Sequence, residues 1–332
     1  MTQQLMAGID IGGTKIAVAI AAAEGKIIAR DSFPTEAVRS PLDLMTQALE
    51  TIGRLAETQS GRLAAIGIGC AGPLDLERGV VLAPPNMPRN WRQFPLRSFV
   101  ESKFRLPVIV DNDANAAALA EHLFGAGRGY SDLVYLTIST GIGGGIIANN
   151  DLVHRWGEAG HVTVNPGGAR CGCGARGCLE AECSGTAIAR RAQEHLLSGK
   201  PSKLRELVDD IKQVSAKTVK DAAQEGDEMA CAVWQETVSL MAIGIGSIIA
   251  LLAPQAIILG GGVAAGAGEF LLQPLRAELN QRVRIINMEE VQVLQAAFGA
   301  DSGLYGAVAL AAGSLPEGKT RRHDLQDLQD DR

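Results

Sequence analysis

The chain has 332 residues, enough for two domains of ordinary size. Apolar residues make up 46% and charged residues 20%, which is typical of a globular protein and excludes a disordered one. A formal net charge of -6 and an aromatic content of 4% argue against nucleic acid as the main partner, because binding it calls for a basic stripe or stacking side chains.

The apolar segments favour a cytoplasmic protein over a membrane protein. The first apolar run already contains Asp10, so it does not resemble a secretory signal. The longest apolar stretch, residues 240–259, is interrupted by Ser247, Pro254 and Gln255. We therefore expect a buried helix that leads into a buried strand, and no membrane span.

The first third of the chain alternates short apolar strands with helices. Residues 6–11 and 15–22 are predicted strands joined by Gly12-Gly13, a pair that tolerates the backbone angles of a tight hairpin. Ser40-Pro41 predicts a helix start, with serine as the N-cap and proline at the first helical position. One face of that helix is apolar, and its expected members are Leu42, Met45, Leu49, Ile52 and Ala56. The remaining expected elements are strands over 27–32, 63–70 and 106–111 and a helix over 113–124.

A second unit repeats the pattern of the first: a strand, a glycine-rich turn and a returning strand. Residues 133–139 form a predicted strand that runs into a glycine-rich turn, and residues 145–148 form the returning strand. Two such hairpins indicate a duplicated fold with a ligand held between its halves. Helices are expected over 186–197, 227–253 and 304–312, a buried strand over 256–259, and a loose polar tail from residue 315.

Three glycine-rich strand ends carry the signal for phosphate binding. The first is Asp10–Lys15, where glycines let backbone N–H groups approach a phosphate, Thr14 adds a hydroxyl, and Asp10 is a candidate Mg²⁺ ligand. The second is the run from Ser139 to Gly145, and the third is Gly260-Gly261-Gly262. Each alone also fits an ordinary turn, and the first lacks the spacing of a Walker A loop.

Asp111-Asn112-Asp113 lies where a predicted strand ends and a helix begins, the place where ligands gather in α/β sheets. As an isolated residue, Asp113 fits a simple helix N-cap. The alternative is a general base, because a sugar hydroxyl becomes a competent nucleophile when a carboxylate accepts its proton.

Four further residues predict a structural metal centre. His161, Cys171, Cys173 and Cys178 supply one imidazole and three thiolates, a closed tetrahedral shell for Zn²⁺ with no position left for a catalytic water. Cys183 is a spare thiol beside this set. Glu158, Glu180 and Asn86 surround the loop or precede it, and carboxylates and amides are the groups that bind sugar hydroxyls.

These motifs together resemble the ROK family of bacterial sugar kinases and sugar-responsive repressors. The matching segments are DIGGTK, AGPL, DNDANAA, TGIGGG, GEAGH and CGCGARGCLE, in that order, over residues 7–312. The resemblance implies a two-domain, actin-like and hexokinase-like α/β fold (ribonuclease H-like) with an interdomain cleft. The implied domains are residues 1–114 with 300–314, residues 115–299 with the zinc loop, and a tail over 315–332.

The resemblance also implies ATP-dependent phosphorylation of a hexose hydroxyl with Asp113 as the general base. The implied sugar pocket consists of Gly72, Asn86, Asn112, Asp113, Glu158, His161 and Glu180. The implied phosphate, Mg²⁺ and nucleotide contacts are Asp10, Gly12, Gly13, Thr14, Lys15, Thr140, Gly141, Gly143, Gly261 and Gly262. A homodimer or homotetramer is typical of the family.

One departure from the family pattern concerns the sugar. The segment before Glu158 is shorter than in the family and carries Arg155 and Trp156, so the sugar remains open between a hexose such as glucose and an N-acetylated hexosamine. The alternative that is not an enzyme is a sugar-responsive transcriptional repressor. Only nine residues precede Asp10, too few for the helix-turn-helix domain that such repressors carry there.

Overall fold

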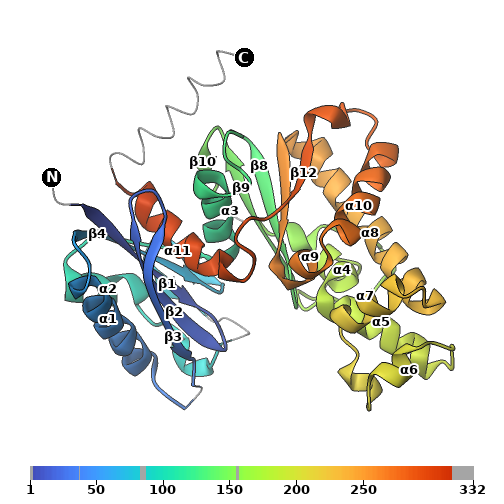
Figure 1. The fold of residues 1–332 in the computed structure, drawn as a ribbon, viewed down its shortest axis with the longest axis horizontal. Helices are drawn as coiled ribbons and strands as arrows, with labels where there is room; N and C mark the ends of the chain where they lie inside the picture. Colours follow the sequence, from blue (N-terminus) through green and yellow to red (C-terminus); the bar gives the residue numbers. More distant parts are fainter. Residues whose placement is uncertain (1–2, 37, 83–86, 155–156, 316–332) are drawn as a thin grey trace. The chain divides into compact units, whose positions relative to one another are not determined.

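The computed structural model describes residues 3–36, 38–82, 87–154 and 157–315 (Figure 1). Its internal contacts divide the chain into two compact units. The first unit consists of Met1–Ser131, Gly145–Arg155 and Ala300–Arg332, and the second of Asp132–Gly144 and Trp156–Gly299. The first unit extends to residue 131, beyond the expected boundary at residue 114, because the helix after Asn112 packs within it.

The first unit is built on a five-stranded sheet with the order β3-β2-β1-β4-β7. Strand β1 pairs antiparallel with β2 and parallel with β4, and β4 pairs parallel with β7. The strand predicted over residues 15–22 has the observed bounds, and the other predicted strands agree to within about two residues at each end. The strands are β1 (Gln4–Ile11), β2 (Lys15–Ala22), β3 (Ile27–Pro34), β4 (Arg62–Cys70) and β7 (Val108–Asn112).

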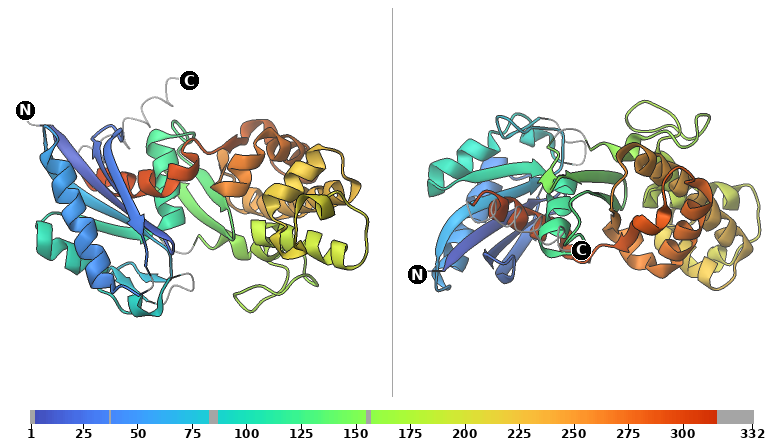
Figure 2. Two further views of the ribbon diagram at one scale, coloured as in Figure 1. Left: turned by 60° about the horizontal axis from the view of Figure 1, so that its bottom comes forward. Right: turned by 90° about the horizontal axis from the view of Figure 1, so that it is seen from above.

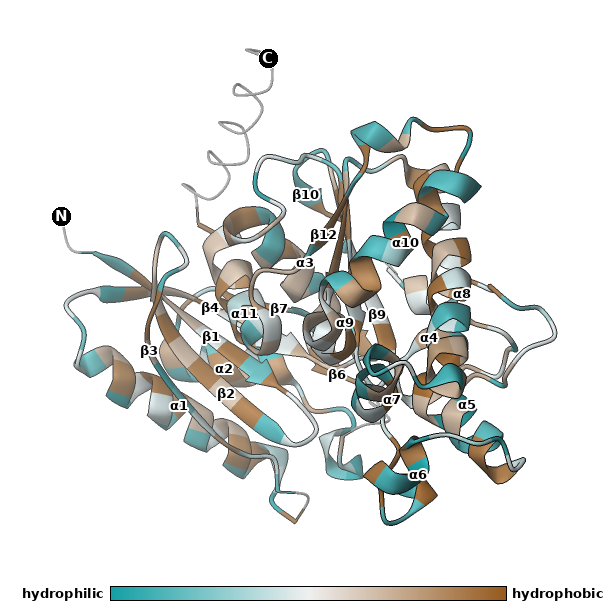
Figure 3. Ribbon diagram, turned by 45° about the vertical axis from the view of Figure 1, so that its right-hand side comes forward, coloured by the Kyte–Doolittle hydropathy of each residue, from teal (hydrophilic) through white to brown (hydrophobic). Residues whose placement is uncertain are grey.

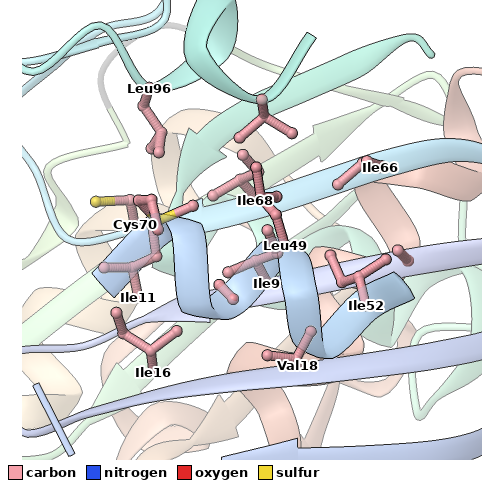
Figure 4. Packing of buried hydrophobic residues seen from close by; sticks show 14 of the residues in the cluster. Ile9, Ile11, Ile16, Val18, Leu49, Ile52, Ile66, Ile68, Cys70 and Leu96 are labelled. Atoms are coloured by element: carbon pink, nitrogen blue, oxygen red, sulfur yellow. The ribbon is translucent and has the colours of Figure 1, made fainter. Parts of the chain in front are cut away.

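Successive side chains of β1 and β2 point to opposite faces of this sheet, so both faces carry apolar residues. One face carries Ile9 of β1 and Val18 of β2, which pack with Leu49 and Ile52 of helix α1 (Pro41–Glu57), as Figure 4 shows. The opposite face carries Met6 and the alanines of β2, which pack against helix α11 (Ser302–Gly313). The sheet is therefore covered on both sides.

Helix α1 begins as the sequence predicts. The side chain of Ser40 accepts a hydrogen bond from the backbone N–H of Asp43, and Pro41 opens the helix. Apolar and polar residues alternate along it (Figure 3), but Leu42 is exposed and Leu44 is buried, so the expected membership of the apolar face was wrong at Leu42.

Helix α11 makes the closest backbone contacts in the first unit. Gly67 of β4 lies directly under it, and a Cβ atom at that position would overlap the carbonyl oxygen of Ala307. Gly306 makes a similar approach to Ala116 of helix α3 (Asp113–Phe124), whose predicted bounds are confirmed. In both views of Figure 2, α11 runs along the sheet of this unit.

The smaller elements of the first unit lie between the large ones. A two-residue turn at Asn149 and Asn150, both with positive φ, joins the end of β9 (Ile142–Ala148) to β10 (Asp151–Leu152). The others are β5 (Leu74–Asp75), β6 (Val80–Val81), the 3₁₀ turns Arg89–Trp91 and Gly299–Asp301, and α2 (Leu96–Phe104).

The second unit contains a parallel arrangement of β8 (Leu133–Ile138), β11 (Ala256–Gly260) and β12 (Gln292–Gln295). Their sheet has the order β10-β9-β8-β11-β12, and the boundary between the units falls within β9. The returning strand that the sequence predicts over residues 145–148 is observed as the last part of β9.

Helix α8 (Glu228–Leu252) is the central helix of the second unit. Asp227 caps its start and Ala253 ends it in a left-handed conformation, close to the predicted bounds. It is long and apolar enough to cross a membrane, but it packs against α4, α5, α7 and α10. The remaining helices are α4 (Leu179–Cys183), α5 (Gly185–Leu197), α6 (Leu204–Leu207), α7 (Ala216–Gln224), α9 (Gly261–Ala267) and α10 (Glu269–Arg282); the 3₁₀ turns are Ala159–His161, Ile211–Gln213 and Met288–Glu290.

Candidate active site and metal centre

Three parallel strands of the first unit end at one edge of its sheet. Ile11 of β1 pairs with Cys70 of β4, and Cys70 pairs with Asn112 of β7. The glycine turn after Ile11, Gly72 after β4, and the Asn112-Asp113 pair after β7 therefore leave the sheet side by side. This carboxyl edge is where ligands bind in α/β sheets.

The first glycine turn is closed by backbone hydrogen bonds. The N–H of Gly12 donates to the carbonyl of Lys15 at 3.0 Å, and the chain after β3 supports the turn through Thr35. The Thr35 hydroxyl donates to the carbonyl of Gly12 at 2.8 Å, and its N–H donates to the carbonyl of Thr14 at 2.9 Å. Thr14 and Lys15 remain exposed, so the hydroxyl and the ammonium group are available to a phosphate.

Asp10 precedes this turn and is electrostatically linked to Asp113. Burial, followed by the negative charge of Asp113, raises the pKa of Asp10 from 3.8 to about 6, and Lys15 opposes this shift. Gly303 of α11 lies against the Asp10 carboxylate. Two carboxylates that repel one another, one largely buried and one exposed, are a suitable setting for a divalent cation with oxygen ligands, so these residues fit Mg²⁺.

The start of α3 assigns different roles to Asn112 and Asp113. Asn112 is the N-cap, and its side-chain oxygen accepts from the N–H of Ala114 at 2.9 Å. The interpretation of Asp113 as the N-cap was therefore wrong, although its Oδ1 also accepts from the same N–H at 2.8 Å. Asp113 is the first helical residue and its side chain is exposed at the carboxyl edge. Gly72 lies against Asn112, with 3.3 Å between the side-chain nitrogen of Asn112 and the position of a Cβ at residue 72.

Behind this edge lies a buried carboxylate that the sequence analysis left without a role. Asp111 Oδ1 accepts from the N–H of Asn112 at 2.7 Å and from the side-chain amide of Asn115 at 2.8 Å. Its Oδ2 lies 2.8 Å from Nδ1 of His154. Spacing gave no signal for this contact, because 43 positions separate the two residues.

In the second unit, the four predicted metal ligands converge. The ligand atoms of His161, Cys171, Cys173 and Cys178 all lie within 4.8 Å of one another. Cys171 Sγ is 3.6 Å from His161 Nδ1, and Cys173 Sγ is 3.7 Å from Cys178 Sγ. Tetrahedral zinc with bonds of ~2.3 Å to sulfur and ~2.0 Å to nitrogen places such atoms ~3.5–3.8 Å apart. The residues present therefore fit Zn²⁺.

The loop that carries these cysteines has a second, metal-independent anchor. Glu182 of α4 is buried; its Oε1 accepts from the N–H of Ala169 at 2.7 Å, and its Oε2 pairs with Arg191 of α5 at 3.2 Å. Cys183 is buried beside this pair, its thiol faces the carbonyl of Thr237, and burial raises the thiol pKa to about 12. Cys183 does not belong to the metal-ligand cluster.

His161 and Glu180 connect the metal cluster to polar groups around it. While Nδ1 of His161 faces the thiols, its Nε2 is 3.6 Å from the carboxylate of Glu158. Glu180 accepts from the N–H of Ile142 at 3.0 Å, and its other oxygen lies 3.9 Å from Cys171 Sγ. Glu180 therefore bridges the second glycine turn and the cysteine loop.

The second and third glycine runs lie together at the ends of β8 and β11. Thr137 pairs with Gly260, and Gly261 has φ of +81° with its Cα packed on the backbone of Ile138, where only glycine fits. The start of α5 closes on the same turn, since the Thr186 hydroxyl donates to the carbonyl of Thr140 at 2.8 Å. Gly262 faces open space. Gly141 and Gly143 lie in or directly after this turn, and the remaining predicted residue, Asn86, is outside the described residues.

Comparisons with known proteins agree with this geometry. The model of the ROK family matches residues 6–314. A glucokinase of Thermotoga maritima is 34% identical over 93% of this chain and 98% of its own length. An N-acetylmannosamine kinase of Escherichia coli is 34% identical over 92% of this chain and 98% of its own length.

A solved structure extends the likeness to three dimensions. The ROK family glucokinase of Streptomyces griseus, in complex with glucose and AMPPNP, is 37% identical and aligns with a TM-score of 0.74. The alignment covers 92% of this chain and 99% of that one. The predicted two-domain, actin-like fold is confirmed by this likeness.

Proposed function

This chain belongs to the ROK family, and we propose that it is a sugar kinase that transfers the γ-phosphoryl group of ATP to a hydroxyl of a hexose. The observation that carries the proposal is the carboxyl edge of the first unit. There the pairing of Ile11 with Cys70 and of Cys70 with Asn112 brings the exposed carboxylate of Asp113 to the same edge as the glycine turn after Asp10. A general base and a phosphate-binding turn are the two parts that phosphoryl transfer to an alcohol needs together.

In the proposed reaction Asp113 accepts the proton of the attacking sugar hydroxyl. Gly72 and Asn112 lie beside Asp113 and would contact the sugar, with Asn86, Glu158, His161 and Glu180 as the other proposed contacts. The backbone N–H of Gly13 with Thr14 and Lys15 would hold phosphate oxygens, and Gly12, whose own N–H is bonded to the carbonyl of Lys15, would shape the turn. The proposed nucleotide contacts of the second unit are Thr140, Gly141, Gly143, Gly261 and Gly262.

Two metal ions belong to the proposal. Asp10 would hold Mg²⁺, which neutralises charge on the phosphates when it is bound. His161, Cys171, Cys173 and Cys178 would hold Zn²⁺, which ties the cysteine loop together and orients His161. With Nδ1 directed at the metal, Nε2 of His161 and the nearby Glu158 are left to face a sugar hydroxyl.

Glucose is the first proposed substrate because the ROK family glucokinase solved with glucose and AMPPNP is 37% identical to this chain, against 34% for the N-acetylmannosamine kinase. An N-acetylated hexosamine is the second, on the strength of the N-acetylmannosamine kinase relatives. A sugar-responsive regulator without catalysis is the least supported alternative. We also propose a cytoplasmic location and a homodimer or homotetramer. The only support for these two points is the resemblance to the ROK family.

A coupled assay of ADP release tests the proposal. The purified chain is incubated with ATP, Mg²⁺ and one sugar at a time from glucose, mannose, fructose, N-acetylglucosamine and N-acetylmannosamine. We expect glucose to give the highest kcat/KM. Preference for an N-acetylated sugar would select the second substrate class, and no ADP release above the sugar-free rate with any sugar would refute the kinase.

A further inference from the structure

A histidine outside the predicted site contacts the support of the proposed base. His154 Nδ1 and Asp111 Oδ2 are 2.8 Å apart. The side chain of Asp111 is 2% exposed and that of His154 is 62% exposed, so a buried carboxylate is paired with a side chain at the surface. In the tautomer that carries its hydrogen on Nδ1, His154 donates to the carboxylate oxygen of Asp111.

Asp111 also stabilises the junction between β7 and α3, where Asp113 lies. Its other oxygen, Oδ1, bonds to the N–H of Asn112 and to the side chain of Asn115 in the first turn of α3. These bonds join the end of β7 to the start of α3 on either side of Asp113. Rotation of the Asp111 carboxylate would break both, and the bond from His154 opposes that rotation.

His154 follows the hairpin of β9 and β10, and this hairpin packs against α3. Gly145, in the last part of β9, lies so close to α3 that a Cβ there would be 2.6 Å from Cβ of Ala118 and 2.8 Å from the carbonyl of Ala114. The Asn149-Asn150 turn returns the chain as β10, and β10 contacts α3 as well. The N–H of Val153 donates to the carbonyl of Ile146 at 2.9 Å, so the backbone directly before His154 is held to β9.

We infer that His154 is a positioning residue for the proposed kinase reaction, acting through Asp111 to hold Asp113 in the geometry that proton transfer requires. The inference rests on the proposed function. It also gives a use to the shortened segment before Glu158, where residues 150–154 form the end of the hairpin and anchor it beside the proposed base. Base catalysis is sensitive to such support, since a displacement of ~1 Å costs on the order of 100-fold in rate.

The test compares three variants with the wild type on the best sugar of the panel. His154→Ala should lower kcat about 10- to 100-fold while KM for the sugar changes less than about threefold. His154→Asn, whose amide nitrogen takes the place of Nδ1, should recover kcat to within about threefold of wild type. His195→Ala is the control, a histidine on α5 of the second unit, and should leave kcat unchanged.

A second measurement examines the pair without relying on catalysis. The midpoint of urea unfolding is compared for His154→Ala, Asp111→Asn and the double variant. If the pair acts as one unit, the double variant should shift the midpoint no further than Asp111→Asn alone. Additive shifts would contradict the contact.

The outcomes separate the two claims. An active wild type whose kcat is unaffected by His154→Ala overturns the positioning role and leaves the kinase standing. A loss of kcat that His154→Asn does not restore also overturns it, because the hydrogen bond is then irrelevant. A wild type that phosphorylates no sugar overturns the proposed function and the positioning role together. The comparison of urea-unfolding midpoints still reports whether the contact between His154 and Asp111 forms.

Discussion

Gly303 of α11 faces the carboxylate of Asp10 so closely that a Cβ at residue 303 would lie 2.5 Å from Oδ2. Real Cβ atoms do not approach an oxygen that closely, so the helix and the carboxylate fit only if residue 303 has no side chain. The position of Asp10, and of any cation bound to it, therefore depends on a residue almost 300 positions further along the chain.

Gly303→Ala should lower kcat/KM for Mg·ATP about 10- to 100-fold, because the added methyl group must displace the Asp10 carboxylate. Steady-state kinetics with ATP as the varied substrate measure this. Gly53→Ala is the matched control: Gly53 is in the middle of α1, where a Cβ meets nothing within 4 Å. That variant should keep full activity and gain about 0.5–1 kcal/mol of stability. Equal activity of both variants would contradict the steric argument.

The shifted pKa of Asp10 predicts a pH dependence of stability. Its pKa is about 6 in the folded chain and near 3.8 when unfolded, so between these values the folded chain binds more protons. The contribution of Asp10 to the free energy of unfolding is therefore present below pH 3.8 and is lost as the pH rises through 6. Urea unfolding of the wild type and of Asp10→Asn, from about pH 4.5 to pH 7.5, should show a steeper fall for the wild type over this window. Parallel curves would refute the shift.

Asp113→Asn should lower kcat about 100- to 10,000-fold, because the amide cannot accept the proton of the sugar hydroxyl. The substitution preserves the size of the side chain and its bond from the N–H of Ala114, so sugar affinity should change little. Isothermal titration with the preferred sugar measures affinity, and ADP release measures turnover. Turnover near that of the wild type would remove Asp113 from its proposed role.

Cys173→Ser should remove most of the zinc, because one of four ligands is lost from a closed shell. We expect metal content to fall from about one ion per chain and Tm to fall by on the order of 10 °C, since binding of a structural metal contributes to folding. Mass spectrometry of metal content and thermal unfolding measure the two effects. Cys231→Ser is the control, because Cys231 is outside the cluster, and should keep both values. A zinc-free wild type with unchanged Tm would contradict the structural role.

Local signals in the sequence predicted most of the first unit. The bounds of β2 and α3 are those expected, and Ser40 caps α1 as predicted. These features depend on neighbouring residues alone, which is why sequence suffices. The error at Leu42 arose because the apolar pattern fits two phases of the helix, and packing on the sheet selected the one that buries Leu44.

The site was predicted in part for the same reason. The cysteine motif was compact, and the metal cluster formed as expected. The contact of His154 with Asp111 and the support of Gly12 by Thr35 join residues that are distant in sequence and belong to no motif. The sequence analysis assigned no element to residues 269–282, where the structure has helix α10 with Pro274 in its interior, a residue that disfavours a helix. In the structure α10 packs against α8.

The position of α11 has a consequence for how the protein is made. Its residues are synthesised almost 300 residues after Met6 and more than 280 after Ala19, yet they cover both side chains. Until residues 302–313 emerge, one face of the amino-terminal sheet has no partner and presents bare alanine and methionine to other nascent chains. Premature termination before this helix should therefore yield an aggregation-prone fragment rather than a smaller folded protein.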